Sequence, residues 1–212
     1  MHLLLVKINY NAYNYNIIDD IWQGIFKKIL ETKFVSLAKK LELKGIIWYI
    51  IKSEKYTQER NVVKMIAIGS DHGGYKLKEE IKRYLDEKEI KYIDCGTNSE
   101  ESVDYPNIAK EVARKIQNKE CEEGILICRS GIGMSIVANK FKGIRCAKCD
   151  NEEEAKFAKM HNDSNVLALG ADYIPTNEAI CVVRAWIATG FQGGRHQDRI
   201  NIIKEIENEN MK

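Results

Sequence analysis

The segment from Gly124 to Lys140 constrains the fold of this chain more than any other. It opens with the apolar run Gly-Ile-Leu-Ile-Cys at 124–128, which is typical of a parallel strand covered on both faces. The next five residues, Arg-Ser-Gly-Ile-Gly, are rich in glycine, and residues 134–140 have a helical composition. The segment therefore predicts a strand, a tight loop and a helix in immediate succession.

Such a junction can hold an anion and activate a thiol. Backbone N–H groups in the first turn of a helix lack intrahelical partners, and the positive end of the helix dipole points at the loop. Cys128 ends the strand, so the geometry that activates its sulfur as a base would also stabilise an oxyanion beside it. A buried structural cysteine before an ordinary turn explains the same residues equally well. The segment alone leaves both interpretations open.

From Met65 onward, strand and helix patterns alternate. Strands are expected over residues 65–69, 91–95, 124–128, 144–149 and 166–169, and helices over residues 75–87, 106–116, 133–140, 152–160, 176–189 and 198–207. This alternation predicts βαβ units and a parallel sheet that helices cover on both faces. Ligands of such sheets bind beyond the carboxyl ends of the strands.

Polar and small residues follow the expected strands and would gather at that edge. These segments are Ser70–Gly74, Gly96–Asn98, Cys128–Gly131, Asp150–Asn151 and Gly170–Asp172. Each is weak evidence by itself, because aspartate commonly caps helices and paired glycines commonly form turns. Together they predict a ligand site at the carboxyl edge of the sheet.

Two further segments carry residues suited to catalysis or anion binding. Arg195 and Arg199 are four apart, so a helix that starts near Gln197 would bring both guanidiniums to one side, where they could hold a phosphate. A solvated basic turn is the alternative. His161 precedes an expected strand, where a lone histidine is more often a structural hydrogen bonder than a catalyst.

Composition excludes several classes of protein. With 212 residues, 44% of them apolar, the chain can build one sizeable core, or one core and a small appendage. Residues 65–212 hold 22 basic and 25 acidic residues, and this mildly acidic balance argues against nucleic acid as a partner. No run approaches the roughly 18 apolar residues of a membrane span, and residues 1–10 do not resemble a signal peptide, so a cytoplasmic location is expected.

The six cysteines fall mostly in strand-like runs, where reduced thiols behave as small hydrophobes rather than as a disulfide framework. Cys146 and Cys149 are three apart on an expected strand, so they should point to opposite faces of the sheet. There is no second Cys or His pair at metal-binding spacing. We therefore expect neither a metal site nor redox chemistry at this pair.

Residues 1–64 contain no catalytic constellation and carry a net charge of +5. Helices are conceivable over 17–28 and 34–43, and a strand over 45–51. Residues 1–64 allow three interpretations: a docking appendage, a poorly ordered extension, or a translation start placed too early, with Met65 as the natural beginning. We favour an N-terminal extension that the remaining domain does not need.

Five motifs in residues 65–212 together carry a specific resemblance. They are Gly-Ser-Asp-His-Gly-Gly-Tyr at 69–75, Ser-Val-Asp-Tyr-Pro at 102–106, Ile-Cys-Arg-Ser-Gly-Ile-Gly-Met-Ser-Ile-Val-Ala-Asn-Lys at 127–140, His-Asn-Asp-Ser-Asn-Val-Leu at 161–167 and Gly-Gly-Arg-His-Gln-Asp-Arg-Ile at 193–200. In order and spacing they resemble the ribose-5-phosphate isomerase B family, which includes galactose-6-phosphate isomerase subunits. The resemblance covers none of the first 64 residues.

The resemblance implies a Rossmann-like three-layer αβα fold with a mostly parallel five-stranded sheet. It also implies a homodimer or a dimer of dimers with shared active sites, and a sugar-phosphate substrate. The implied reaction is the interconversion of ribose 5-phosphate and ribulose 5-phosphate in the pentose phosphate pathway, without cofactor or metal. Such an isomerisation needs one base to move a proton and donors that await the developing oxyanion.

The resemblance also assigns roles to residues of this chain. Cys128 is the base that moves the proton between C1 and C2 of the open-chain sugar, and His161 is the acid or base that opens the furanose ring. Ser130 holds the enediolate oxygen together with the backbone of Arg129, Gly131, Ile132 and Gly133. The remaining implied substrate-binding residues are Asp71 and Asn162 on sugar hydroxyls, His72, Arg195 and Arg199 on the phosphate, and Tyr105.

Two residues depart from the family pattern. Arg129 stands where the family normally has glycine, and Asp172 stands where some relatives carry a phosphate-binding arginine. Arg129 would be strained if its backbone needed positive φ; otherwise its guanidinium could lie near Cys128. We expect an outward-pointing Arg129 in a preserved loop, with phosphate binding that rests more heavily on Arg195 and Arg199.

Two alternatives to ribose 5-phosphate isomerisation remain open. The first keeps the chemistry and changes the substrate to galactose 6-phosphate or allose 6-phosphate, because the sequence does not measure the depth of a pocket. The second is a phosphosugar-binding module without catalysis. A module of this kind is expected to lack Cys128 or His161, but both residues are present.

Overall fold

The computed structural model describes residues 65–211, so the N-terminal extension and the elements expected over 17–28, 34–43 and 45–51 lie outside the described residues. The strands are β1 (Ile66–Ser70), β2 (Tyr92–Asp94), β3 (Glu123–Cys128), β4 (Cys146–Lys148) and β5 (Val166–Gly170). The helices are α4 (Tyr75–Glu87), α5 (Tyr105–Gln117), α6 (Ile132–Ala138), α7 (Glu152–Asn162), α8 (Thr176–Ala188) and α9 (Arg195–Asn210). Every strand and helix expected after Met65 is present in this part of the chain.

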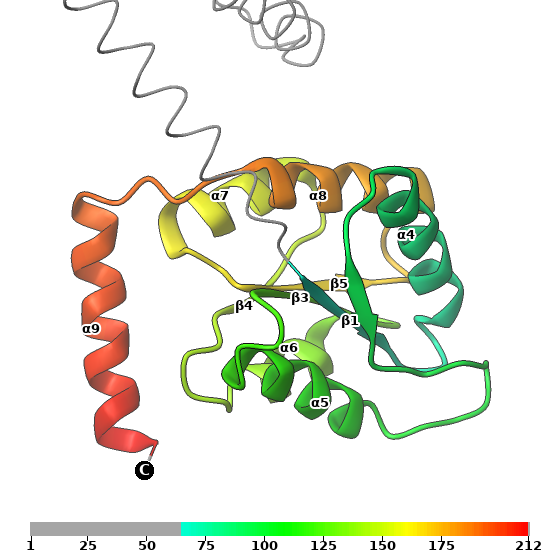
Figure 1. The fold of residues 1–212 in the computed structure, drawn as a ribbon, viewed down its shortest axis with the longest axis horizontal. Helices are drawn as coiled ribbons and strands as arrows, with labels where there is room; N and C mark the ends of the chain where they lie inside the picture. The colour runs from blue at the N-terminus through cyan, green and yellow to red at the C-terminus, as the bar shows by residue number, and fades with distance from the viewer. Residues whose placement is uncertain (1–64, 212) are drawn as a thin grey trace, which may run out of the picture. The chain divides into compact units, whose positions relative to one another are not determined.

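The five strands form one sheet in the order β2-β1-β3-β5-β4, and each neighbouring pair is parallel. Between the central strands, Gly124 pairs with Val166 and Cys128 pairs with Gly170. All carboxyl ends therefore meet at one edge (Figure 1). The expected parallel sheet is confirmed.

Helices cover both faces of this sheet, as the continuous apolar strands require. Figure 1 shows α4, α7 and α8 on one side and α5 and α6 on the other. Ile125 and Ile127 pack toward the first group, whereas Leu126 and Cys128 pack toward the second, because successive side chains of a strand point to opposite faces. Burying each large aliphatic side chain contributes about 2 kcal/mol, so the two cores stabilise the three-layer arrangement.

Cys146 in the edge strand β4 and Cys149 just after it lie on opposite faces of the sheet, as expected. Cys146 packs against the α5 and α6 side of the sheet, and Cys149 packs in the core on the opposite face. Within residues 65–211 no three His, Cys, Asp or Glu side chains lie together as a group suited to a metal ion. None of the helices in that range combines the length and apolar character that a membrane crossing requires.

The last helix begins earlier than the sequence predicted, at Arg195 rather than Asp198. The cause is the glycine pair before it: Gly193 and Gly194 have φ values of +66° and +56°, a region that few other residues adopt. The chain therefore turns at the pair and enters the helix at once. Arg195 and Arg199 consequently occupy the first turns of α9 on neighbouring positions.

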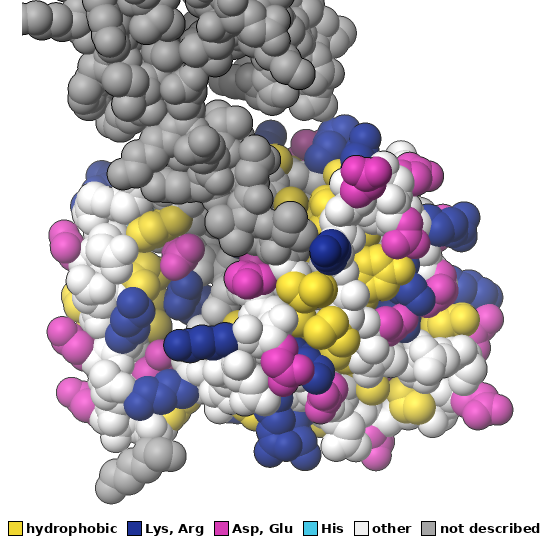
Figure 2. Space-filling model, in the orientation of Figure 1, with side chains coloured by type: hydrophobic (Ala, Val, Ile, Leu, Met, Phe, Trp, Pro, Cys, Tyr) yellow, Lys and Arg dark blue, Asp and Glu magenta, His cyan; other side chains and the backbone are white. Residues whose placement is uncertain are grey.

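Helix α9 stands apart from the three layers (Figure 1) and exposes apolar side chains. Ile202 and Ile206 are 54% and 53% exposed, although both are large aliphatic residues. Figure 2 shows hydrophobic side chains along this helix, at the left of the view. Helix α6 likewise exposes Ile132 and Ile136, by 53% and 55%.

A buried lysine joins α4 to the carboxyl end of β2. The side chain of Lys78 is fully buried, and its Nζ donates to Asp94 Oδ1 at 2.6 Å and to the Thr97 carbonyl at 2.7 Å. Lys82 Nζ lies 2.7 Å from the other carboxylate oxygen of Asp94. Burial alone would raise the pKa of Asp94, but hydrogen bonds from the two lysines and the Gly96 N–H hold it below the ordinary value.

Candidate active site

Cys128 is the last residue of β3, at the carboxyl edge of the sheet. The residue is 5% exposed and belongs to the core on the α5 and α6 side. Its Sγ accepts a hydrogen bond from the Gly131 N–H at 3.1 Å. The sulfur therefore faces the loop that follows the strand, and an N–H donated to it stabilises negative charge there.

The loop after Cys128 has the conformation that its glycines permit. Gly131, the residue before α6, has φ = +74°, and a Cβ at this position would lie 2.9 Å from the carbonyl carbon of Leu169. Any other residue would meet both a strained backbone and a clash. Ser130 Oγ accepts from the Ile132 N–H at 3.3 Å. The sharp turn thus directs the Gly131 amide at the sulfur that ends β3 and places the Ser130 hydroxyl and the Ile132 amide in the same loop.

Arg129 lies in this loop without backbone strain, since its φ is not positive. Its side chain is 67% exposed, and its Nη1 lies 3.5 Å from Asp172 Oδ2. The aliphatic part of the Arg129 side chain packs against Gly73, where a Cβ would lie 2.5 Å from Arg129 Cγ. The two residues that depart from the family pattern therefore face each other, although an exposed pair of this kind contributes at most about 1 kcal/mol.

Asp71 and His72 follow β1 and lie beside this loop. Asp71 is 7% exposed, its N–H donates to the Ile127 carbonyl at 3.1 Å, and its Oδ1 accepts from the Gly74 N–H at 2.9 Å. His72 Nδ1 accepts from the Val103 N–H at 3.3 Å. We infer from this bond that the proton of the neutral imidazole is on Nε2, which leaves that nitrogen as a donor.

Tyr105 completes the group at the carboxyl edge. It begins α5 and is 39% exposed. A Cβ on Gly133 would lie 2.8 Å from the Tyr105 ring, so the ring covers the first turn of α6. The structure thus brings together most of the predicted site residues, which are Asp71, His72, Tyr105, Cys128, Arg129, Ser130, Gly131, Ile132 and Gly133.

The other predicted residues lie at the opposite edge of the sheet. Helix α7 runs back from the end of β4 to the start of β5, so His161 and Asn162 at its end lie near the amino ends of the strands. Arg145, immediately before β4, holds this end of α7: its Nε donates to the Asn162 carbonyl at 3.1 Å, and its Nη2 bonds Asp163 Oδ2 at 2.6 Å.

Arg195 and Arg199 belong to the same second group. His196, which follows Arg195, stacks on His161 with ring centroids 4.3 Å apart, and this contact places the start of α9 beside the end of α7. Both arginines are exposed. Val166, at the start of β5, pairs with Gly124, which is four residues before Cys128 on β3. At about 3.3 Å per residue along a strand, the two groups of site residues therefore lie roughly 13 Å or more apart along the sheet.

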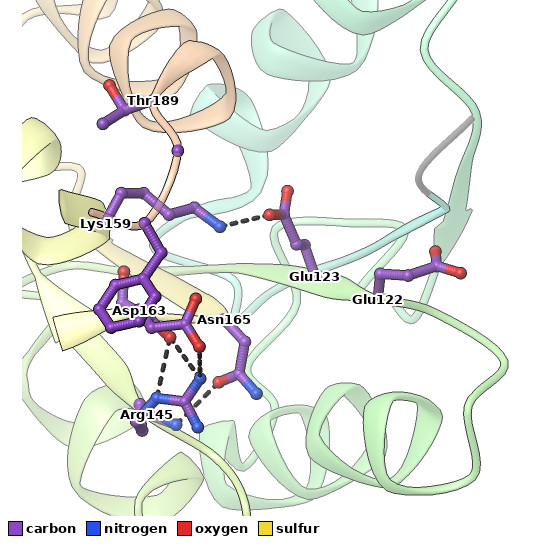
Figure 3. Close-up of a pocket in the computed structure, with 10 residues that line it drawn as sticks. Glu122, Glu123, Arg145, Lys159, Asp163, Asn165 and Thr189 are labelled. Carbon is purple, nitrogen blue, oxygen red and sulfur yellow. Dashed lines mark hydrogen bonds and ion pairs between the residues drawn. The ribbon is translucent and has the colours of Figure 1, made fainter. Parts of the chain in front are cut away.

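A pocket of about 300 Å³ opens at this second edge (Figure 3). Four of its five charged side chains pair with one another, Lys159 with Glu123 and Arg145 with Asp163, as the dashed lines show. None of the predicted site residues lines it. The lining residues are Glu122, Glu123, Arg145, Lys159, Asp163, Ser164, Asn165, Thr189, Gly190 and Phe191. We therefore do not assign the predicted chemistry to this pocket.

Sequence reasoning gave no role to His196, although the motif Gly-Gly-Arg-His contains it. The residue is 6% exposed and stacks flat on His161, with 7° between the ring planes. Burial lowers the pKa of the His196 imidazole below its ordinary value, and electrostatic interactions with His161, Arg195 and Arg199 lower it further. Only the packing of α9 on α7 reveals this contact, because 35 residues separate the rings in sequence.

Known proteins resemble this chain over the part that contains the site residues. The family described as Ribose/Galactose Isomerase matches residues 66–203. Ribose-5-phosphate isomerase B of Escherichia coli is 45% identical over 145 residues, which are 68% of this chain and 97% of that protein. The solved structure of ribose-5-phosphate isomerase B of Clostridium thermocellum is 47% identical with a TM-score of 0.68, and the match covers 68% of this chain and 98% of that one.

A further solved structure contains a bound sugar phosphate. Ribose-5-phosphate isomerase B of Mycoplasma genitalium, with bound ribulose 5-phosphate, is 38% identical with a TM-score of 0.66. The match covers 69% of this chain and 97% of that protein. The similarity therefore spans nearly the full length of each relative and the C-terminal part of this chain.

Proposed function

Because the chain belongs to the ribose/galactose isomerase family, we propose that it is the aldose–ketose isomerase that interconverts ribose 5-phosphate and ribulose 5-phosphate. The observation that carries this proposal is the Cys128 sulfur, which accepts the Gly131 N–H beside a hydroxyl and further amides. The names of the Escherichia coli and Clostridium thermocellum relatives support the five-carbon substrate. We place the reaction in the pentose phosphate pathway of the cytoplasm.

In the proposed reaction, the Cys128 thiolate takes the proton from C2 of the open-chain aldose. The electron pair forms the C1–C2 double bond of an enediolate, and negative charge develops on O1. Ser130 and the amides of residues 129–133 stabilise that oxygen. The thiol then returns its proton to C1, while O2 becomes the carbonyl oxygen and its proton passes to O1. Losing a single preorganised donor of this kind typically costs about 10²–10³-fold in kcat.

We propose that two copies of the chain share each active site. A general base or acid must reach its proton within hydrogen-bond distance, yet in one chain His161 and Cys128 lie at opposite edges of the sheet. A second copy could bring His161, Asn162, Arg195 and Arg199 to the Cys128 loop, with the arginines on the phosphate beside His72.

The exposed isoleucines support a homodimer or a dimer of dimers. Ile132 and Ile136 lie at the Cys128 loop, and Ile202 and Ile206 lie on α9 beyond the two arginines. Large aliphatic side chains exposed in pairs on two helices are typical of an interaction site. A two-fold axis would let α9 of each copy cover α6 of the other, since such an interface uses the same patches twice.

A panel of sugar phosphates tests the substrate. We expect the highest kcat/KM with ribose 5-phosphate, and lower values with galactose 6-phosphate and allose 6-phosphate, because the latter carry an additional carbon between the carbonyl end and the phosphate. The measurement is the initial rate of ketose formation. A higher kcat/KM for either six-carbon substrate would replace the proposed substrate, and no turnover of any aldose phosphate would refute the isomerase proposal.

The same panel of sugar phosphates also tests whether residues 1–64 are needed for catalysis. We propose that residues 65–212 are the isomerase domain and that residues 1–64 are dispensable for catalysis, since the family match covers residues 66–203. A version of the protein that begins at Met65 should keep both its kcat/KM and its oligomeric state. Loss of either would show that the extension contributes.

Mixing two inactive variants tests the shared site. Cys128→Ser and His161→Ala should each be inactive, whereas subunits exchanged at a 1:1 ratio should recover about a quarter of wild-type activity, because half of the dimers are mixed and each has one intact site. Unmixed variants at the same concentration are the control. A mixture as inactive as its components, despite demonstrated exchange, would place each site within one chain.

A further inference from the structure

Two other rings stack on the His161 ring. Phe157, one turn earlier on α7, stacks on it with centroids 5.0 Å apart and 26° between the planes. His196 of α9 stacks on it with centroids 4.3 Å apart and 7° between the planes. The His161 side chain itself is only half-buried. The ring edge, with its nitrogens, is thus the part of His161 that is left to meet a ligand.

His196 is placed by packing rather than by a side-chain hydrogen bond. It is 6% exposed, and within residues 65–211 its Nδ1 has no hydrogen-bond partner. Its backbone N–H donates to the Gly193 carbonyl at 3.1 Å, in the turn that starts α9. The same burial that covers the ring favours its neutral form. A neutral ring can lie flat on His161 whether or not His161 carries a proton, whereas two stacked cations would repel each other.

We propose that His196 is a positioning residue for ring opening: together with Phe157 it holds the His161 imidazole in one plane, so that the ring edge meets the sugar. This inference rests on the proposed function and adds a role within it. In the step concerned, a proton leaves the O1 hydroxyl, the O1 electrons form the C1 carbonyl, and the C1–O4 bond breaks with its electron pair on O4. O4 then gains a proton, so the imidazole ends as it began.

Ring opening and proton transfer between C1 and C2 can be measured separately. Ribulose 5-phosphate is acyclic, because its C5 oxygen carries the phosphate and cannot close a furanose ring. Exchange of its C1 hydrogen in deuterated water requires only the enediolate step at Cys128. Conversion of cyclic ribose 5-phosphate requires ring opening as well. A residue that acts through His161 should therefore affect the second reaction and spare the first.

The test is His196→Ala, read by NMR as C1 exchange of ribulose 5-phosphate and by initial rate as isomerisation of ribose 5-phosphate. We expect isomerisation to fall about 10²-fold, the cost of a catalytic group misplaced by about 1 Å, while C1 exchange stays close to wild type. His196→Phe, which keeps a flat neutral ring, should restore most of the lost isomerisation. Lys204→Ala, exposed on the same helix, is the matched control.

Three results would overturn the inference: wild-type isomerisation in His196→Ala, an equal loss of isomerisation and exchange, or a His196→Phe variant as impaired as His196→Ala. If His196→Ala does not fold, His196→Leu fills the volume without a flat ring and should show the same split between the two reactions. A wild-type protein that isomerises no sugar phosphate would instead refute the proposed function, which is a distinct outcome.

Discussion

A Cys128→Ser substitution is expected to lower kcat for ribose 5-phosphate by about 10²–10⁴-fold, the contribution typical of a positioned general base. A serine hydroxyl holds its proton far more tightly than a thiol, so almost no alkoxide would be present to take the C2 proton. The fold should persist, because the smaller oxygen can still accept the Gly131 N–H that now reaches the sulfur. Steady-state kinetics and thermal melting measure the two effects.

Cys121→Ser is the matched control. Cys121 is 2% exposed in the same core cluster as Cys128 but has no place in the proposed site, so its variant reports the cost of a buried hydroxyl alone. It should remain active. The Cys128→Ser variant should also lose C1 exchange of ribulose 5-phosphate, which separates it from changes at His161 or His196. Full turnover in Cys128→Ser would reject the sulfur as the base.

An Asp94→Asn substitution is expected to lower the free energy of unfolding by about 3 kcal/mol, since removing the nearer partner of a buried ion pair is strongly destabilising and leaves only Glu79 Oε1, 3.6 Å away, to balance the charge. The charge concerned is that of Lys78, whose side chain is fully buried 2.6 Å from Asp94 Oδ1. The loss should fall at the low end of the usual range, because the amide oxygen of asparagine can still accept from Lys78. Denaturation by urea at neutral pH measures the difference.

The pH dependence supplies a second readout for Asp94. Its pKa is lower in the folded protein than in the unfolded chain, so the unfolded state binds more protons as the pH falls. The stabilisation is fully present above the unfolded value of about 4 and is lost as the pH falls through the folded value. The stability difference between wild type and Asp94→Asn should therefore shrink in acid.

Asp86→Asn is the control for Asp94→Asn. Asp86 is exposed on α4, and its carboxylate accepts a 3.3 Å hydrogen bond from the Tyr92 hydroxyl. The expected change in stability is within about 0.5 kcal/mol. An Asp94→Asn variant as stable as this control at neutral pH would show that the carboxylate is not what stabilises the buried ammonium.

The architecture of residues 65–211 could be predicted because its signals are local. Apolar runs such as 124–128 mark strands buried on both faces, and the spacing of Leu77, Ile81 and Leu85 marks one face of a helix. Helix ends were less predictable: the start of α9 depends on the positive φ values of Gly193 and Gly194. The roles assigned to the site residues stay predictions, although the carboxyl-edge group does lie together.

The sequence by itself determined the succession of strands and helices along the chain, the glycine-rich loop after Cys128 and the kinds of side chain available for chemistry. Only the tertiary structure decided which of them meet. Arg129 faces Asp172, and His196 stacks on His161, through contacts between segments far apart in the sequence. His161 and Cys128 lie at opposite edges because a crossover helix returns to the start of the next strand. Local patterns specify elements, but the packing of elements sets the distances between their ends.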